Sequence, residues 1–291
     1  MSTSPTVSIL ISAYEQLEIT KRCLHEIRST LDSILPYEII LVDDDSSEAT
    51  RNHLQELLPS PHQILHNTKR RGFAHNNNLA AKHASAPFLC LLNNDVFVQG
   101  DWLAPMLQVF EDHPDAGMVG NVQKRYHNKQ YDHMGVVFGP AGNPRHFGQH
   151  FLHRPFQNEV KEWSAVTAAC CVCKRERFLE LGGFDEIFLN GCEDVDLCLR
   201  MTKAGYRNFV VHDSVVIHVK GATEGRKNHN QRNARILDDR WGDSIRSNQS
   251  IRDQHLHALT YLWRFLIRPW SCNFDKLMEA LLIHFRLKRL H

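Results

Sequence analysis

The feature that most restricts the fold of this 291-residue chain is a regular alternation of apolar and helical segments in its first hundred residues. Short apolar runs rich in β-forming residues occupy residues 7–12, 38–42, 63–65 and 88–92. Between them, helical spacing of apolar residues covers residues 19–31, 49–58 and 74–85. Strands that are apolar throughout must be covered on both faces. The pattern therefore predicts an α/β fold with a mostly parallel sheet flanked by helices.

The second half of the chain continues with more widely spaced elements. Strand patterns occupy residues 118–122, 166–173, 209–211 and 215–219, and helix patterns occupy residues 175–181 and 194–204. Between the first two of these strands lies a polar stretch rich in Gly and Pro, residues 139–155. The length suits one large domain, which we expect over residues 1–246, followed by a C-terminal tail over residues 247–291.

The composition bears on three questions: whether the protein binds nucleic acid, where in the cell it is found, and whether its cysteines bind zinc. The 34 Lys and Arg nearly balance the 33 Asp and Glu, so the net charge gives no general attraction to nucleic acid. The first dozen residues lack the features of a secretory signal, and no run of 18 apolar residues occurs. We therefore expect a cytoplasmic protein. The eight cysteines do not form the paired CxxC knuckles of a zinc site, which favours reduced, buried thiols.

Polar residues follow the apolar strands at the points where those strands end. Ser12, Ala13 and Tyr14 follow the first strand, Asp43, Asp44 and Asp45 the second, and Asn93, Asn94 and Asp95 a third. Ligands of such sheets bind outside the carboxyl ends of the strands, so we predict that these groups share one crevice. Asp44 can accept a hydrogen bond from the N3 imide of uracil or thymine, and Tyr14 offers a ring for stacking. The alternative is that the segment from Asp43 to Ser47 only caps the helix that starts near Glu48, or that one of its acids caps while another binds.

Two residues are candidate ligands of a divalent cation. Asp95, with neutral asparagines before it, suits an ion such as Mg²⁺ that takes oxygen ligands and keeps several waters. His218 ends an apolar strand and could bind the same ion, with the basic residues 220–227 closing over a diphosphate. The alternatives are an ordinary turn at residues 93–95 and a structural histidine.

A third candidate segment carries three carboxylates within four residues, Glu193, Asp194 and Asp196, at the start of a predicted helix. Acids at a helix start are also explained by the helix dipole. Crowding of like charges, however, favours proton uptake by one of them, and we predict that Asp194 is a general base. Gly72, preceded by Arg71, opens another helix where backbone N–H groups could hold phosphate or ribose oxygens.

In their order along the chain, these segments resemble the family 2 glycosyltransferases, in particular the rhamnosyltransferase-like and galactofuranosyltransferase-like branch. The resemblance covers residues 7–241 and rests on VSILISAY, IILVDDDSS, RRGFAHNNN, LLNNDV, GGFDE, CEDVDLCLR, KAGYR and VVIH. It implies a GT-A fold, inversion at the anomeric carbon, and a Mg²⁺ or Mn²⁺ ion. Asn93 departs from the family pattern, because many relatives carry the first acid of a DXD motif there.

The resemblance also assigns roles residue by residue. It places Ser12, Tyr14 and Asp44 at the donor nucleotide, Asp95 and His218 at the metal, and Asp194 as the base with Glu193 beside it. The neighbouring Ala13, Arg71, Gly72 and Asn94 complete the predicted nucleotide site. Trp163 is expected either to stack on an acceptor sugar or to belong to the core.

We therefore expect transfer of a sugar from UDP or dTDP to a hydroxyl of a glycan or lipid-linked glycan acceptor, in bacterial cell-surface polysaccharide synthesis. One alternative is a sugar nucleotidyltransferase, which would need a glycine-rich basic loop where this chain has SAYEQL. Another is an inactive module that binds sugar nucleotides or glycans. The joint presence of Asp44, Asp95, Asp194 and His218 argues against such a loss of activity.

The predicted tail over residues 247–291 is rich in aromatic, aliphatic and basic residues. From residue 250 onward it holds seven Lys and Arg, among them Arg286, Lys288 and Arg289, against three Asp and Glu. An amphipathic basic segment can lie on the anionic inner face of the plasma membrane. It can equally form a helical cap on the domain, and the sequence leaves both interpretations open.

Overall fold

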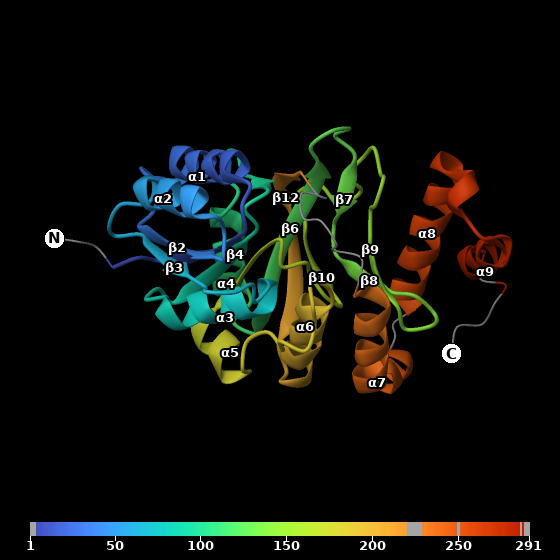
Figure 1. Cartoon of the computed structure of the whole chain (residues 1–291). Coiled ribbons are helices and arrows are strands. Elements are labelled where there is room, and N and C mark those ends of the chain that lie inside the picture. Colours follow the sequence, from blue (N-terminus) through green and yellow to red (C-terminus); the bar gives the residue numbers. More distant parts are fainter. Residues whose placement is uncertain (1–3, 220–228, 249–250, 286, 288–291) are drawn as a thin grey trace.

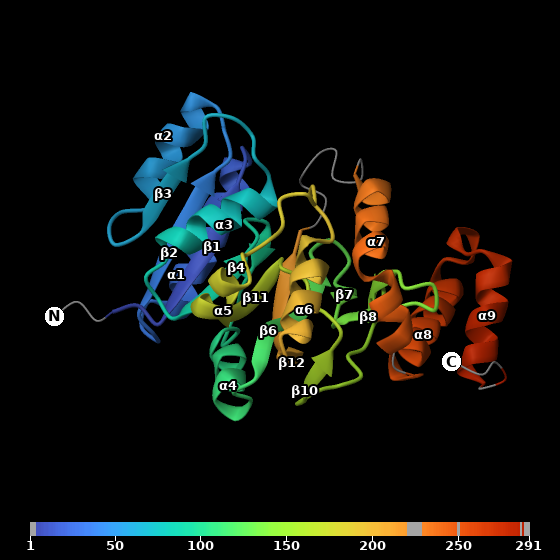
Figure 2. The same ribbon diagram turned by 90° about the horizontal axis from the view of Figure 1, so that it is seen from below.

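The computed structural model describes residues 4–219, 229–248, 251–285 and 287. Within these ranges a ten-stranded mixed sheet runs through the molecule in the order β10-β12-β6-β11-β4-β1-β2-β3, with β5 and β7 pairing at its side. Helices cover both faces of this sheet, and the last helices extend from its far end (Figures 1 and 2). This arrangement confirms the predicted α/β class.

The first half of the chain forms the parallel part of the sheet. Its strands are β1 (Val7–Ala13), β2 (Tyr37–Asp43), β3 (Gln63–His66) and β4 (Phe88–Leu92), and its helices are α1 (Leu17–Leu31), α2 (Glu48–Leu57) and α3 (Phe73–His83). Apolar side chains of β1 point alternately to the two faces: Ile9 and Ile11 pack with α1 and α2, while Leu10 packs with α3. Each strand is thus buried on both sides, as its unbroken apolar run predicts.

The second half adds antiparallel strands to the parallel ones. Its main elements are α4 (Ala104–Asp112), β6 (Ala116–Arg125), β10 (Val160–Trp163), β11 (Cys170–Lys174), α5 (Arg175–Glu180), α6 (Glu193–Lys203) and β12 (Arg207–His218). Shorter strands are β5 (Val96–Phe97), β7 (Tyr131–His133), β8 (Val136–Phe138) and β9 (Pro144–His146). β11 lies antiparallel between β4 and β6, whereas β12 runs parallel to β6.

The structure corrects two of the predicted strands. Residues 209–211 and 215–218 belong to one strand, β12, whose pairing with β6 shifts register between Val211 and Val215, and residue 219 lies just beyond it. The polar residues 212–214 in that irregular stretch interrupt the apolar pattern, so the sequence predicted two strands. In addition, β11 begins at Cys170, later than predicted, because residues 166–169 leave the strand pattern.

The cysteines make no disulfide in the structure. All eight are free, and six of them are buried. Burial raises the pKa of Cys173 to about 12, so its thiol stays protonated at neutral pH. No group of three or more potential metal ligands occurs among the described residues, which argues against the zinc interpretation.

The C-terminal helices are α7 (Asn230–Asn248), α8 (Ile251–Ile267), the short 3-10 helix η1 (Pro269–Ser271) and α9 (Phe274–His284). α7 places Leu237, Trp241 and Ile245 in the main core, and the expected domain boundary after residue 246 falls in its last turn. α8 is fixed to the domain by a 2.9 Å hydrogen bond from Trp263 Nε1 to the His150 carbonyl. None of the described helices has the length and apolarity needed to cross a membrane.

His212 on β12 is a buried titratable group of this fold. Its ring packs against Phe156 and Trp163, and neither ring nitrogen has a hydrogen-bond partner among the described residues. Desolvation, followed by the positive charge of Arg154, lowers the pKa of His212 to about 4. The unfolded chain takes up this proton near pH 6.5 while the folded protein does not. Proton uptake by His212 in the unfolded chain therefore lowers the free energy of unfolding as the pH falls from about 6.5 towards 4.

We expect His212→Phe to reduce the loss of stability in acid. The difference in free energy of unfolding between the variant and the unmodified protein should be about 2 kcal/mol more favourable to the variant at pH 5 than at pH 7.5. The reason is that the unfolded variant no longer gains this proton. Urea denaturation at the two pH values measures the difference. His25→Gln, at an exposed position, is the control. The same pH dependence in His212→Phe and the unmodified protein would contradict the assignment.

Candidate functional site

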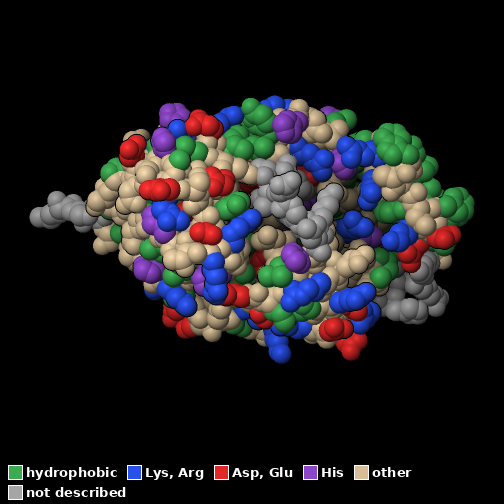
Figure 3. All heavy atoms as spheres, viewed as in Figure 1, with side chains coloured by type: hydrophobic (Ala, Val, Ile, Leu, Met, Phe, Trp, Pro, Cys, Tyr) green, Lys and Arg blue, Asp and Glu red, His purple; other side chains and the backbone are tan. Residues whose placement is uncertain are grey.

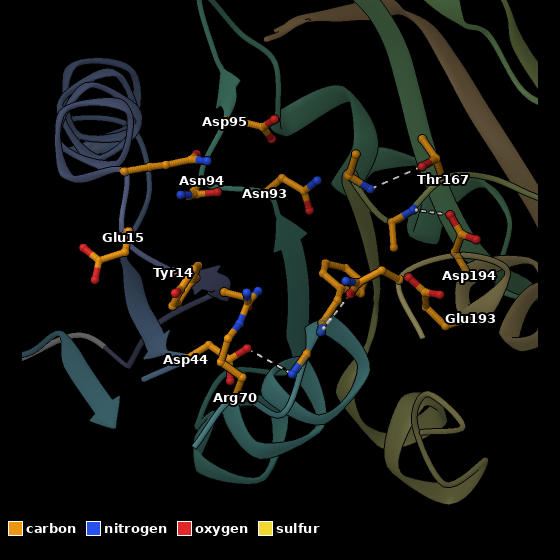
Figure 4. A pocket seen from close by; sticks show the side chains of 17 residues that line it. Tyr14, Glu15, Asp44, Arg70, Asn93, Asn94, Asp95, Thr167, Glu193 and Asp194 are labelled. Atoms are coloured by element: carbon orange, nitrogen blue, oxygen red, sulfur yellow. Dashed lines mark hydrogen bonds between the residues drawn. The ribbon is translucent and has the colours of Figure 1, made fainter. Parts of the chain in front are cut away.

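A pocket of about 380 Å³ opens at the carboxyl ends of β1, β2 and β4 (Figure 4). It brings together predicted site residues from distant parts of the chain: Ser12, Tyr14, Asp44, Gly72, Asn94, Asp95, Glu193 and Asp194. It is also lined by Asn93, which was expected in the same crevice, and by residues that the sequence analysis did not assign: Glu15, Gln16, Arg70, Phe73, Thr167, Ala168, Ala169 and Asn190. The predicted crevice therefore exists and holds Asp95 and Asp194 together.

Asp44 organises the floor of this pocket. Its side chain accepts backbone N–H bonds from Arg71 to Oδ1 at 2.8 Å and from Gly72 to Oδ2 at 3.0 Å. Asn67 Nδ2 donates a third bond to Oδ1 at 2.8 Å. Gly72 has φ +85°, a conformation that favours glycine, so the loop can fold back onto the carboxylate. These bonds leave an acceptor position on Oδ2.

A buried chain of hydrogen bonds extends from Asp44 to the end of β1. Asn67 Nδ2 donates to Asn76 Oδ1 at 2.7 Å, and Asn76 Nδ2 donates to Ser12 Oγ at 2.8 Å. Asn76 is only 1% exposed although it lies within α3. The sequence analysis missed Asn67 and Asn76. The run of three asparagines in a predicted amphipathic helix was the signal that could have found Asn76.

Among residues 43–47, for which capping of α2 was the alternative, Ser47 takes that role. Ser47 is the N-cap of α2 and accepts from the Thr50 backbone N–H at 3.4 Å. Glu15 supports this cap, because its side chain accepts from Ser47 N and from Thr50 Oγ1, each at 2.6 Å. These bonds, above all the one from Thr50, lower the pKa of Glu15. Asp44 is thus available to the pocket.

Tyr14 and Arg70 form one wall of the pocket. The Arg70 guanidinium carbon lies 3.7 Å from the centre of the Tyr14 ring, which is a cation–π contact. Tyr14 is 38% exposed, and Figure 4 shows both side chains beside Asp44. One face of the ring is therefore covered by the guanidinium. Ala13 is buried and contributes its carbonyl, which accepts from Asp44 N at 2.8 Å.

Asp95 and His218 meet because β5 pairs antiparallel with the end of β12, with Val96 opposite His218. Asp95 Oδ1 lies 3.2 Å from His218 Nε2. His218 Nδ1 lies 3.1 Å from Gln123 Oε1, and since an amide oxygen only accepts, Nδ1 carries the hydrogen. In the neutral imidazole, Nε2 then directs its lone pair towards Asp95. His218 is 3% exposed and lies behind Asp95 instead of lining the pocket.

These two residues fit a divalent cation. Nε2 of His218 is buried and makes no hydrogen bond of acceptable geometry within the described part of the chain. An imidazole lone pair and a carboxylate oxygen that converge in this way are suitable ligands for Mg²⁺ or Mn²⁺. The described residues would supply only a pair of protein ligands, since no larger cluster is found among them.

Glu193 and Asp194 lie on the opposite side of the pocket from Tyr14 and Asp44 (Figure 4). They begin α6, which follows Cys192 at φ +73°. Asp194 is half-buried, and its two oxygens accept backbone N–H bonds from Ala168 at 3.1 Å and Val195 at 2.8 Å. These bonds hold the carboxylate towards the pocket. Glu193 accepts from the backbone N–H of Gly191 at 2.5 Å.

Asp196, the third acid of this group, does not belong to the pocket. It is fully buried and accepts from Arg200 and Arg240, each at 2.8 Å, and from Trp241 Nε1 at 2.9 Å. Two guanidinium groups thus neutralise it. The crowding predicted from the sequence therefore involves two acids at the pocket, because the helix turns Asp196 into the protein.

Other predicted site residues lie elsewhere. Trp163 is 3% exposed and packs against Phe147, with ring centres 5.2 Å apart. Gly135 lies against its ring so closely that a Cβ there would be 2.1 Å away. No ring face is left for a sugar, so the core interpretation of Trp163 replaces the acceptor role.

The Arg71 side chain faces Glu186 at 3.5 Å, and only its backbone serves the site. The predicted loop with Lys220, Gly221, Arg226 and Lys227 lies outside the described residues.

Comparison with known proteins identifies the class. Residues 8–179 match the family model described as Glycosyl transferase family 2. The O-antigen biosynthesis protein RfbC of Myxococcus xanthus is 30% identical over 235 residues, which are 76% of this chain and 18% of that protein. The chain thus spans about a fifth of the length of this curated relative.

Two solved structures share the fold. GalNAc-T7 with UDP, GalNAc and Mn²⁺ has a TM-score of 0.65 and 17% identity, covering 84% of this chain and 50% of that one. The mannosyltransferase PcManGT from Pyrobaculum calidifontis, in complex with GDP-Man and Mn²⁺, has a TM-score of 0.62 and 21% identity, covering 99% and 77%. These likenesses confirm the predicted GT-A fold.

We expect Asp196→Ala to destabilise the protein by about 2–3 kcal/mol, because it leaves the buried indole N–H of Trp241 without its acceptor and two partly exposed guanidinium groups without their carboxylate. Asp238→Ala is the matched control. Asp238 pairs with Arg246 at 2.7 Å on the surface, so its loss should cost about 1 kcal/mol or less. Urea denaturation measures both. Equal effects of the two substitutions would show that Asp196 is not the structural anchor inferred here.

Proposed function

Since this chain belongs to the family 2 glycosyltransferases, we propose that it transfers a sugar, with inversion, from a pyrimidine nucleoside diphosphate to a hydroxyl of a glycan or lipid-linked glycan. The observation that carries the proposal is the shared pocket. Asp44, Asp95 and Asp194 line one cavity although they lie on three separate segments of the chain. A donor nucleotide and an attacking hydroxyl need these groups within reach of one another.

The proposed preference for UDP or dTDP rests on Asp44. Its Oδ2 retains an acceptor position, which suits the N3–H of uracil or thymine, and the hydrogen bonds from Arg71, Gly72 and Asn67 fix its direction. Tyr14 lies next to it and offers an aromatic surface. The two solved relatives contain UDP in one case and GDP-Man in the other, so they do not decide the base.

The proposed metal ligands are Asp95 and His218, with Gln123 holding the imidazole so that Nε2 points to the ion. When bound, Mg²⁺ or Mn²⁺ would neutralise the charge that develops on the diphosphate. Both solved relatives contain Mn²⁺. Asn93 and Asn94 border the same part of the pocket as neutral groups.

Asp194 is the proposed general base. Each of its oxygens accepts one backbone hydrogen bond and keeps a lone pair, so the carboxylate can take the proton of an acceptor hydroxyl without losing its orientation. Its position across the pocket from Asp44 suits attack on the face of the sugar opposite the leaving diphosphate. Glu193 lies beside it at the pocket wall.

The acceptor and the setting are proposed from the relatives and motifs. A relative named for O-antigen biosynthesis supports bacterial cell-surface polysaccharide as the product. The motif resemblance favours the rhamnosyl- or galactofuranosyl-transferring branch. The proposed location is the cytoplasm.

We expect a thermal-shift screen to rank UDP and dTDP above GDP. At a hundredfold excess over Kd, a pyrimidine diphosphate should raise the midpoint by about 5 °C, because a ligand that binds only the native state stabilises it. Adding Mn²⁺ should enlarge the shift. His218→Ala should abolish the Mn²⁺-dependent part and keep the shift that UDP gives alone. A larger shift with GDP would remove the role given to Asp44.

We expect Asp194→Asn to keep the UDP-induced thermal shift but to lose at least about a hundredfold in turnover, because proton transfer typically contributes that much or more. Release of nucleoside diphosphate from the best-binding sugar donor gives the rate. Asp101→Asn, at an exposed acid away from the pocket, is the control and should retain full activity. Full activity in Asp194→Asn would exclude it as the base. No release by the unmodified protein would favour an inactive binding module.

A further inference from the structure

The C-terminal helices expose an apolar surface that the rest of the described chain does not cover. On α9 the side chains of Phe274, Met278 and Leu282 are 72%, 41% and 38% exposed, and Phe285 follows at 64%. Their spacing of four, four and three residues places them in one stripe along the helix. Leu266 and Trp270, at the turn between α8 and α9, are 73% and 81% exposed. We call these six residues the apolar crest.

The crest is not needed to hold the two helices together. α8 and α9 pack through a separate small core of Ala258, Ala280 and Ile283, with Tyr261 and Leu262 against it. The Tyr261 hydroxyl accepts from the Asn273 backbone N–H at 2.8 Å and so fixes the turn. The helix pair is also fixed to the domain through Trp263 and Arg252. The crest is therefore presented by a rigid support.

Arginines lie next to the crest without acidic partners. Arg145, Arg264 and Arg268 make no ion pair within the described part of the chain. They are near one another. Desolvation lowers the pKa of Arg145, and the positive charge of Arg264 lowers it further. In the same way, desolvation and the positive charges of Arg125 and Arg268 lower the pKa of His150. Figure 3 shows hydrophobic side chains gathered over α8 and α9, with Lys and Arg side chains beside them.

An exposed apolar stripe beside unpaired arginines suits the surface of an anionic bilayer. An apolar stripe with an exposed tryptophan at its end can enter the interface of a bilayer, and unpaired arginines beside it attract anionic headgroups. Asp275 and Glu279 also lie on α9, so insertion of the crest, more than net charge, must supply most of the affinity. No described helix can span a membrane, so the contact would be peripheral.

We propose that the apolar crest is a membrane-docking surface that binds an anionic phospholipid bilayer, with Trp270 and Phe274 entering the interface and the neighbouring arginines contacting the headgroups. This inference is independent of the donor, metal and base assigned above. It would place the pocket in a protein held at the surface where lipid-linked acceptors reside.

Co-sedimentation of the full chain with vesicles tests the proposal. The protein should bind phosphatidylcholine vesicles that contain phosphatidylglycerol more tightly than vesicles of phosphatidylcholine alone. The double variant Trp270→Ser, Phe274→Ser should lose at least about tenfold in affinity, because each ring leaves the interface. Arg145→Gln with Arg268→Gln should reduce the preference for the anionic vesicles. Ile34→Ser, at a 59% exposed apolar residue on another part of the surface, is the control and should bind normally.

Thermal unfolding of the variants separates docking from folding. The substituted side chains are exposed, so the midpoints should match that of the unmodified protein. Absence of binding to either vesicle by the unmodified protein would overturn the proposal. So would sedimentation of the unmodified protein as a dimer and of the Trp270→Ser, Phe274→Ser variant as a monomer, since the crest would then bind a second copy of the chain.

Discussion

The pocket depends on the way in which the buried carboxylate of Asp44 is satisfied. A carboxylate that is 3% exposed needs donors, and it finds them in Asn67 and in the backbone of Arg71 and Gly72. The same bonds draw the loop before α3 to the end of β2. Through Asn76 they also connect α3 to Ser12 at the end of β1. Satisfying one charge therefore shapes the floor and one wall of the cavity.

The opposite wall comes from the second half of the chain and depends on the antiparallel strand β11. Because β11 pairs with β4 in this direction, the residues just before it, Thr167 to Ala169, arrive at the end of β4 next to Asn93. Ala168 then donates to Asp194 at the start of α6. The proposed base is thus positioned by backbone contacts, whereas Asp44 is positioned partly by side chains.

Much of the fold could be predicted from the sequence because its strands are apolar throughout and its helices are amphipathic. The ends of β1, β2 and β4 were predicted well enough to place Ser12, Asp44 and Asp95 in one crevice. The acids at 193 and 194 were found because three carboxylates crowd within four residues, and Gly72 because it opens a predicted helix whose backbone N–H groups can hold a ligand. His218 was a candidate because it ends an apolar strand ahead of basic residues, and the family motifs assign it the same role.

The remainder of the site could not be predicted because it depends on contacts between distant segments. Nothing local distinguishes Asp194 from Asp196. Only the packing of α7, which brings Arg240 and Trp241, shows that Asp196 is structural. Trp163 was given an acceptor role because exposure is not readable from one residue, and Gly135, which makes room for its ring, lies 28 positions earlier in the sequence.

The irregular pairing within β12 has a consequence for how this family member can change. Side chains of a strand alternate between faces, so the extra residues between Val211 and Val215 decide to which side the end of the strand directs its imidazole. Deleting a single residue there would turn His218 away from Asp95 while leaving every pocket residue in the sequence. Length in this short stretch is therefore as restricted as the identity of the histidine itself.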